Sequence, residues 1–206
     1  FPVWEHPYKF DVICRPDLIP KGTQVVNNLQ LGSVLTGEKK LKVPIKSMMC
    51  WNTNPVTQST ETEKIIKGLQ RKDLFLVSAE HFISDTAAYA DIILPASMGA
   101  EQEDMILSWG HLYLTYNTKC VESPGEAIPN NEIFRRLAKR LGFEEDNFKW
   151  SDSECLENYV DWASPACEGI DLNYMKKNGY ARLNVGTKDN RAPHKEGNFP
   201  TPSGKC

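Results

Sequence analysis

The sequence predicts an α/β fold, in which helices cover both faces of an open parallel sheet and an irregular extension of helices and loops follows. Three short apolar runs at residues 45–51, 74–78 and 92–94 support this prediction. A strand of a parallel sheet is buried on both faces and therefore reads as a continuous apolar run. Helical segments separate these runs, and such alternation is typical of parallel strands joined by crossover helices.

Composition indicates a globular protein with a hydrophobic core. The chain has 206 residues, of which 40% are hydrophobic and 10% aromatic. These values suit one domain of good size, or slightly more. A net charge of −3 argues against a nucleic-acid groove or a membrane surface, and no apolar stretch approaches the roughly 18 residues of a spanning helix. Because the chain opens on Phe1 rather than Met, we expect an internal piece of a longer protein.

Cysteine and histidine spacing predicts no metal site within this segment. No two cysteines stand at the two-residue spacing of zinc or iron–sulfur sites, and no two histidines form a close pair. Free buried thiols are the simpler interpretation. The residues concerned are Cys14, Cys50, Cys120, Cys155, Cys167, Cys206, His6, His81, His111 and His194.

The first half of the chain supplies the elements of the predicted sheet. Residues 1–44 are rich in Pro, Gly and Lys, so loops are expected there, with one short helix or strand near residues 25–35. Thr60 and Glu63 fit a capping box that opens a helix running to about Arg71. Ser84 can cap a short helix at residues 85–90, and Pro95 stops the third strand.

The second half of the chain has a different pattern of apolar and polar residues. Residues 112–116 alternate between apolar and polar, which predicts a half-exposed strand. A helix is expected over residues 129–141, because Pro129 suits a first turn and Gly142 a helix end. Further helices are expected at residues 152–163 and 172–177. Residues 185–206 are polar and predict a surface connection.

Three strand ends are candidate ligand sites, since open parallel sheets bind ligands at the carboxyl ends of their strands. Residues 53–60 follow the first strand and open a helix, whose amides suit phosphate. Asn54 and Gln58 add neutral groups that a base or sugar can use. Glu80 ends the second strand, where an acid commonly holds a ribose or a purine amine. The alternatives are a plain turn at Asn54 and a solvated loop acid at Glu80.

The third strand end is followed by Glu101, Glu103 and Asp104. They could be paired carboxylates, but a solvated surface run is the favoured interpretation, because nothing in the sequence indicates that any of them is desolvated.

Four motifs in register carry a family resemblance. The segments "NPV", "DLFLVSAEHFISDTAAYADIILPAS", "GEAIPNNEIFRRLAKRLGF" and "FPTPSGK" are similar, in order and spacing, to those of the molybdopterin oxidoreductases. These enzymes form the dimethyl sulfoxide reductase superfamily. The resemblance runs from about residue 45 to 141 and resumes at residues 201–205, whereas residues 1–44 and 144–198 match loosely.

The resemblance implies a cofactor, bis(molybdopterin guanine dinucleotide) carrying molybdenum or tungsten. By motif position it places cofactor contacts at Thr53, Asn54, Gln58 and Glu80. Two further contacts are implied at Gln102, where some relatives have Lys, and at Asn130, where many have Asp; both departures remove a charge. The family's metal ligand lies upstream of this region, so no residue of this chain is nominated as catalytic or metal-binding. An iron–sulfur cluster is expected only outside the segment.

The resulting hypothesis is a cofactor-binding fragment of a molybdenum or tungsten oxidoreductase that transfers oxygen atoms or electron pairs in anaerobic respiration, inactive by itself. We expect an irregular lead-in at residues 1–44, a Rossmann-like core at 45–143, and a helical extension at 144–206 leading to a further domain. The expected partners are the remaining domains of the polypeptide and an electron-transfer subunit. Compartment and substrate stay open. Two alternatives also stay open: a free-standing nucleoside-diphosphate-binding domain, and an interaction module without ligand.

Overall fold

The computed structural model describes residues 7–107, 111–185, 196–197, 199 and 201–206. These residues form two compact units. The parallel-sheet unit comprises residues 16–102 and 119–148, and the antiparallel-sheet unit comprises the described parts of 1–15, 103–118 and 149–206. This division differs from the boundaries expected at residues 44 and 143, because most of the lead-in packs on the parallel sheet and residues 103–118 leave it.

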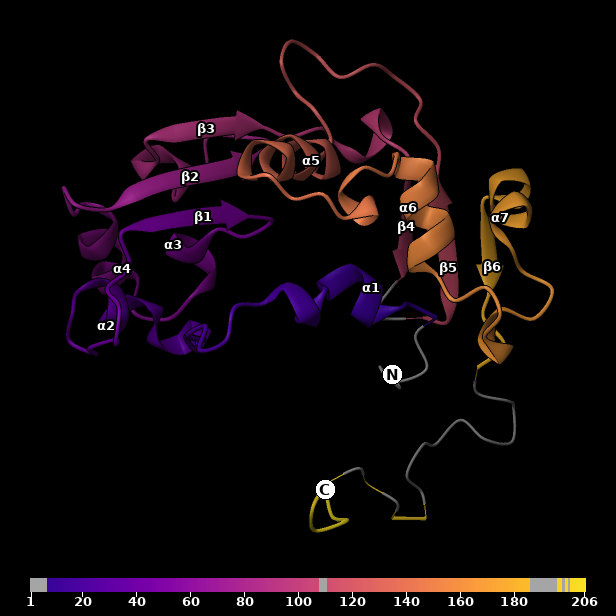
Figure 1. Ribbon diagram of the computed structural model, residues 1–206, viewed down its shortest axis with the longest axis horizontal. Helices are drawn as coiled ribbons and strands as arrows, with labels where there is room; N and C mark the ends of the chain where they lie inside the picture. Colours follow the sequence, from indigo (N-terminus) through magenta and orange to yellow (C-terminus); the bar gives the residue numbers. More distant parts are fainter. Residues whose placement is uncertain (1–6, 108–110, 186–195, 198, 200) are drawn as a thin grey trace. The chain divides into compact units, whose positions relative to one another are not determined.

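The parallel sheet has three strands in the order β1-β2-β3, which are Ser47–Trp51, Phe75–Glu80 and Ile92–Pro95. Both pairings are parallel, and the three arrows point the same way in Figure 1. Trp51 pairs with Ala79, and Ala79 pairs with Leu94. The predicted α/β fold with a parallel sheet is therefore confirmed, and the carboxyl ends of all three strands lie at one edge.

Helices α2 (Leu31–Leu35) and α4 (Thr62–Leu69) pack together over one face of this sheet. The contact is close at Gly68, where an added Cβ would overlap the Cβ of Leu35. The core beneath them is almost fully buried and consists of Leu35, Cys50, Val56, Ile65, Leu69, Leu74 and Leu76. Ile65 and Leu69 form the buried inner face of α4.

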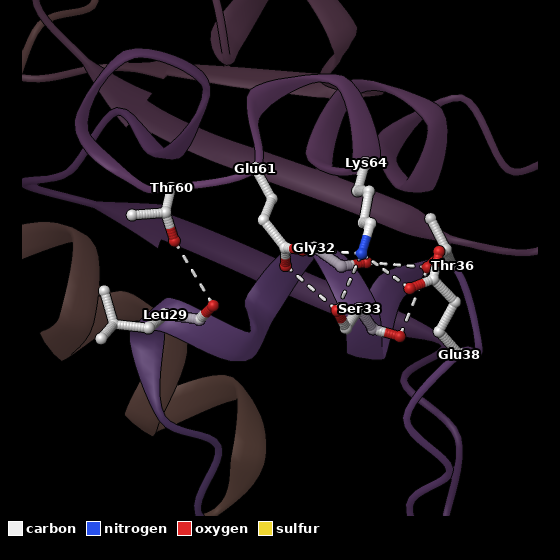
Figure 2. A network of polar contacts seen from close by, with 8 residues as sticks. All are labelled: Leu29, Gly32, Ser33, Thr36, Glu38, Thr60, Glu61 and Lys64. Atoms are coloured by element: carbon white, nitrogen blue, oxygen red, sulfur yellow. Dashed lines mark hydrogen bonds and ion pairs between the residues drawn. The ribbon is translucent and has the colours of Figure 1, made fainter.

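A polar network holds the lead-in against the start of α4, as Figure 2 shows. The Lys64 ammonium lies 2.6 Å from Glu61 and 2.7 Å from Glu38, and the Ser33 hydroxyl donates to Glu61 at 3.0 Å. The predicted capping box is wrong. Glu61 occupies the N-cap in a left-handed conformation with φ 60° and makes no side-chain cap, while the Thr60 hydroxyl donates to the Leu29 carbonyl at 3.4 Å. The lead-in, which local sequence rules ignore, supplies these competing partners.

Helix α5 (Asn130–Leu141) lies on the opposite face, so helices flank both sides of the sheet as predicted. Gly142 ends it with φ 80°, the left-handed conformation expected of a glycine after a helix. The Phe134 ring of α5 stands perpendicular to the Trp51 ring, with centroids 5.0 Å apart. One helix does not cover the whole face, and a groove of about 720 Å³ remains between α5 and the strands.

Short elements complete the parallel-sheet unit. Residues 55–58 form the single turn α3 (Pro55–Gln58), and the helix expected at residues 85–90 is only a 3₁₀ turn, η4 (Ala87–Tyr89). The remaining 3₁₀ turns of the unit are η2 (Pro16–Leu18), η3 (Asn28–Gln30), η5 (Gly99–Glu101) and η6 (Asp146–Phe148).

The antiparallel-sheet unit has its own core around β4 (Asp104–Leu107), β5 (Tyr113–Asn117) and β6 (Tyr180–Arg182), paired in that order. Leu114, Val160, Met175 and Leu183 are buried at its centre. Its helical elements are α1 (Phe10–Cys14), α6 (Asp152–Tyr159), η7 (Pro165–Cys167) and α7 (Leu172–Asn178).

Within this unit the sequence predicted β5, α6 and α7 but neither β4 nor β6. Helix α6 begins with a capping box between Ser151 and Glu154. It ends earlier than expected, because Val160 turns extended and bridges to Tyr8. Much of the polar connection expected at residues 185–206 lies outside the described residues, and residues 201–206 are exposed.

Candidate ligand-binding edge of the parallel sheet

The carboxyl edge of the parallel sheet collects most of the candidate residues. Since Trp51 and Ala79 are partners across β1 and β2, the turn after β1 and Glu80 at the end of β2 leave the sheet side by side. Asn52 enters that turn with φ 52°, a left-handed conformation uncommon for a residue other than glycine. The bend and the acid therefore share one edge, as the sequence predicts.

The turn after β1 is closed by its own side chains. The Gln58 carbonyl oxygen accepts from the Asn54 backbone amide at 2.8 Å and lies 3.2 Å from the Thr53 hydroxyl. Thr53 and Gln58 are exposed, and Asn54 is half-buried. Pro55 begins α3, where its missing amide hydrogen costs nothing. The turn thus presents polar groups in a fixed conformation.

Thr86 is a site residue that the sequence analysis missed. Its hydroxyl donates to Asn54 Oδ1 at 2.6 Å and accepts from the Val56 amide at 3.0 Å, while its own amide donates to the same Asn54 oxygen at 3.2 Å. Thr86 is completely buried. The side-chain oxygen of Asn54 therefore accepts its hydrogen bonds from Thr86 inside the protein, and these bonds fix the conformation of the turn. In the sequence Thr86 only follows Ser84 and Asp85 in a polar turn, which gives no sign of its buried position.

Glu80 is half-buried at the tip of β2. One carboxylate oxygen accepts from the His81 amide at 2.9 Å, and the His81 ring nitrogen lies 2.9 Å from the Ser97 carbonyl, to which it can donate. These contacts tie the ends of β2 and β3 together. They also fix the carboxylate at the strand end.

Asn130 reaches the same edge from α5. Ile128 bridges in parallel to Ala96, the residue after β3, so α5 begins at the carboxyl edge. Its side-chain oxygen is buried and accepts no hydrogen bond from the described residues. Gln102 closes η5 through its amide, which donates to Gly99 at 3.4 Å; strand register does not fix Gln102 at the edge as it does the other residues.

The acidic run after β3 is not the solvated surface that the sequence favoured. Glu101 accepts from the Met98 amide at 3.0 Å, and Glu103 accepts from the Tyr116 hydroxyl at 2.8 Å. Asp104 begins β4, where burial raises the pKa of its carboxyl. Each acid has a separate structural position, so they do not form a paired acid–base site.

Charge and thiol chemistry near the edge are unremarkable. Glu132 in the first turn of α5 lies 2.8 Å from both Arg135 and Arg136, which hold its pKa below the usual value. Burial raises the pKa of Cys50 to about 11, so this thiol stays protonated.

Across the described ranges, no group of three or more His, Cys, Asp or Glu could hold a metal. No helix in the same ranges has the length and apolar character to cross a membrane.

Comparison with known proteins identifies clear relatives. A family model described as molybdopterin oxidoreductase matches residues 18–140. The probable oxidoreductase YoaE of Bacillus subtilis is 35% identical over 200 residues, covering 96% of this chain and 28% of its own. The F420-dependent formate dehydrogenase subunit alpha of Methanocaldococcus jannaschii is 30% identical over 135 residues, covering 66% of this chain and 20% of its own.

Among solved structures, acetylene hydratase from Pelobacter acetylenicus superimposes with a TM-score of 0.66 at 25% identity. The match covers 89% of this chain and 24% of the hydratase. The chain thus spans about a quarter of the length of the relatives it matches.

Proposed function

Because this chain belongs to the molybdopterin oxidoreductase family, we propose that the carboxyl edge of its parallel sheet holds the nucleotide tail of a pterin cofactor. Membership implies a molybdenum or tungsten pterin cofactor. The guanine dinucleotide form is part of our proposal. When bound, the cofactor supplies the redox chemistry of oxygen-atom or electron-pair transfer, and the protein binds, orients and shields it.

The observation that carries the proposal is the convergence of the strand ends and the start of α5 at one edge. The Thr53–Gln58 turn, Glu80 and Asn130 reach that edge from β1, β2 and α5. Edges of this kind bind nucleotides in open α/β sheets. The arrangement therefore suits the organic tail of the cofactor.

The side-chain oxygen of Asn130 needs a hydrogen-bond donor, and this need supports a nucleoside as the ligand at this edge. Its buried oxygen lacks a donor, and an unsatisfied buried acceptor costs about 1–3 kcal/mol. The internal diphosphate of a dinucleotide has no proton to offer at neutral pH, whereas a ribose hydroxyl or a purine N–H can donate. The half-buried carboxylate of Glu80 already accepts from the His81 amide, and it can accept further hydrogen bonds from sugar hydroxyls or from the guanine N–H edge.

The remaining residues take different roles. The exposed Thr53 and Gln58 are offered as direct contacts to the tail, and Asn54 as a residue that acts through the turn it shares with Thr86. Gln102 stays a proposed contact on motif position alone. The longer relatives suggest that other domains complete the site, with an electron-transfer subunit and any iron–sulfur cluster lying outside residues 1–206.

The parent enzyme is proposed to act in anaerobic respiration. Relatives of this chain include a protein named nitrate reductase and one named thiosulfate reductase molybdopterin-containing subunit. Neither a free-standing nucleotide-binding domain nor a ligand-free module gains support from any observation above. By itself the chain should show no turnover.

The full-length gene product that carries this sequence provides the first test. Elemental analysis should find molybdenum or tungsten, and oxidised extracts should show pterin fluorescence with guanine after hydrolysis. A purified, folded protein without metal and pterin, produced in cells able to make the cofactor, contradicts the proposal.

Titration of the 206-residue chain with GDP provides the second test. Glu80→Gln should weaken binding by about tenfold or more, because loss of a charge-assisted hydrogen bond costs roughly 1.5–3 kcal/mol. Glu63→Gln is the matched control, since Glu63 is exposed in the first turn of α4 and belongs to none of the strand-end segments proposed as contacts. Equal GDP affinity in both variants would remove Glu80 from the site.

A further inference from the structure

An aromatic side chain stands at the same edge without a structural explanation. Trp51, the last residue of β1, is 48% exposed. The next residue, Asn52, turns left-handed, so the chain bends away directly beyond the indole. The sequence analysis placed Trp51 only within a buried strand. Its exposure at a ligand-binding edge requires another account.

The Trp51 side chain points to the α5 side of the sheet. Side chains alternate along a strand, so Trp51 shares its face with Ser47 and Met49, which line the groove beside α5. Cys50 points the other way and is buried in the core under α4. The indole therefore projects over the face that α5 only partly covers.

Helix α5 braces the indole. The Phe134 ring stands at 85° to it with a centroid distance of 5.0 Å, a favourable edge-to-face geometry. Asn130 lies four residues before Phe134, which places both on one side of the helix and one turn apart. Asn130, whose side-chain oxygen is unsatisfied, thus lies one helical turn beyond Phe134, toward the edge of the sheet.

We propose that Trp51 is the platform on which the purine base of the cofactor tail stacks, with Asn130 accepting a hydrogen bond from the base. This inference rests on the proposed function and assigns the base to a specific surface. An indole held by a perpendicular neighbour loses little conformational freedom when a base stacks on it. A purine edge also supplies the N–H donor that the Asn130 oxygen lacks.

The assignment leaves the sugar to Glu80. Glu80 follows Ala79 along β2, and Ala79 is the partner of Trp51, so Glu80 projects from the opposite face of the sheet. A nucleoside that stacks on Trp51 crosses the strand ends to reach Glu80. The Glu80 carboxylate then accepts hydrogen bonds from ribose hydroxyls, and the Asn130 side-chain oxygen accepts one from the base.

Phe82 is a second exposed aromatic near this edge, and the structure disfavours it as the platform. It is 69% exposed in the loop after Glu80, and its described ring contact is with His81 at 6.5 Å. Among the described residues, no aromatic ring from a helix packs against it. It therefore serves as an exposed aromatic control, two residues beyond Glu80.

The test follows tryptophan fluorescence of the 206-residue chain during titration with GDP and, separately, with pyrophosphate, while calorimetry measures binding. A stacked guanine quenches indole emission, so GDP should quench and pyrophosphate should not. The quench should disappear in Trp51→Phe and persist in Trp150→Phe, whose residue lies in the antiparallel-sheet unit.

Affinity provides the second readout. Trp51→Ala should weaken GDP binding by about 5- to 150-fold, the range for loss of one stacked base, and should leave pyrophosphate affinity unchanged. Trp51→Phe should retain part of the affinity, and Phe82→Ala should retain all of it. Equal loss for both ligands would indicate a misfolded edge and contradict the specific role.

The outcomes separate this inference from the proposed function. GDP binding that is sensitive to Glu80→Gln but leaves Trp51 emission unchanged overturns the stacking platform and keeps the nucleotide site. Absence of GDP binding by calorimetry to the full-length apoprotein, which carries the domains that complete the site, contradicts the nucleotide site itself, and the platform with it.

Discussion

The two faces of the parallel sheet differ in how completely they are covered. On one face α2 and α4 pack so closely that Gly68 has no room for a Cβ beside Leu35, and Ile65 and Leu76 are almost fully buried. On the other face α5 is the covering helix, and Phe75 remains 47% exposed beside the groove. The closed face stabilises the unit, whereas the open face leaves surface for binding.

The largest expected difference between the two faces concerns the stability lost when neighbouring residues of β2 are truncated. Leu76 is 1% exposed on the closed face, and Phe75 precedes it on the open face. Leu76→Ala should lower the free energy of unfolding by about 2–4 kcal/mol, because it leaves a cavity in a packed core. Phe75→Ala should cost about 1 kcal/mol, since half of the ring is already in water. Urea unfolding of both variants gives the comparison, and equal losses would mean that the faces are equally packed.

Substitution of two glycines should test how closely α2 and α4 pack on the closed face of the sheet. Gly68→Ala forces a side chain into Leu35 and should destabilise the chain by about 1–3 kcal/mol, despite the higher helix propensity of alanine. Gly99→Ala is the matched control, because nothing lies within 4 Å of its added Cβ. Thermal unfolding should separate the two variants. A Gly68→Ala protein as stable as the control would show that α2 and α4 can move apart freely.

The smallest expected effect concerns the surface ion pairs of α5. Arg135 and Arg136 lower the folded-state pKa of Glu132 below its unfolded value. The ion pairs therefore stabilise the fold above the ordinary glutamate pKa, and this contribution is lost as pH falls through the lowered pKa. Because Glu132 is partly exposed, Glu132→Gln should cost only about 0.5 kcal/mol near pH 7.

The difference between the Glu132→Gln variant and the parent chain should shrink as pH falls below about 4, and also in about 1 M salt. Denaturant titrations across pH measure it. A difference that grows on acidification would contradict the assigned direction of the pKa shift.

The parallel sheet could be predicted from the sequence because its signals are local. Continuous apolar runs mark β1, β2 and β3, and Pro129 and Gly142 mark the ends of α5. The capping box at Thr60 failed because the lead-in, about thirty residues earlier in the chain, provides other hydrogen-bond partners. Strands β4 and β6 were missed because they are short and depend on pairing with β5.

The candidate site was only partly accessible from sequence. Strand-end reasoning predicted that the bend after β1 and the acid after β2 share an edge, since the carboxyl ends of parallel strands meet at one edge of a sheet. It could not show that the Asn54 carbonyl is turned inward, because that depends on Thr86 from a later turn. Nor could it show the exposure of Trp51, which depends on how far α5 extends over the strands.

The order of the strands in the antiparallel-sheet unit has a consequence for biosynthesis. Strand β5 pairs on one side with β4, its neighbour in sequence, and on the other with β6, which follows only after α5, α6 and α7. A nascent chain leaving the ribosome therefore holds β5 with one unpaired edge until β6 has been synthesised. Translation that pauses in this interval gives neighbouring nascent chains time to pair with that edge, so elongation rate over residues 118–180 should govern the yield of soluble protein.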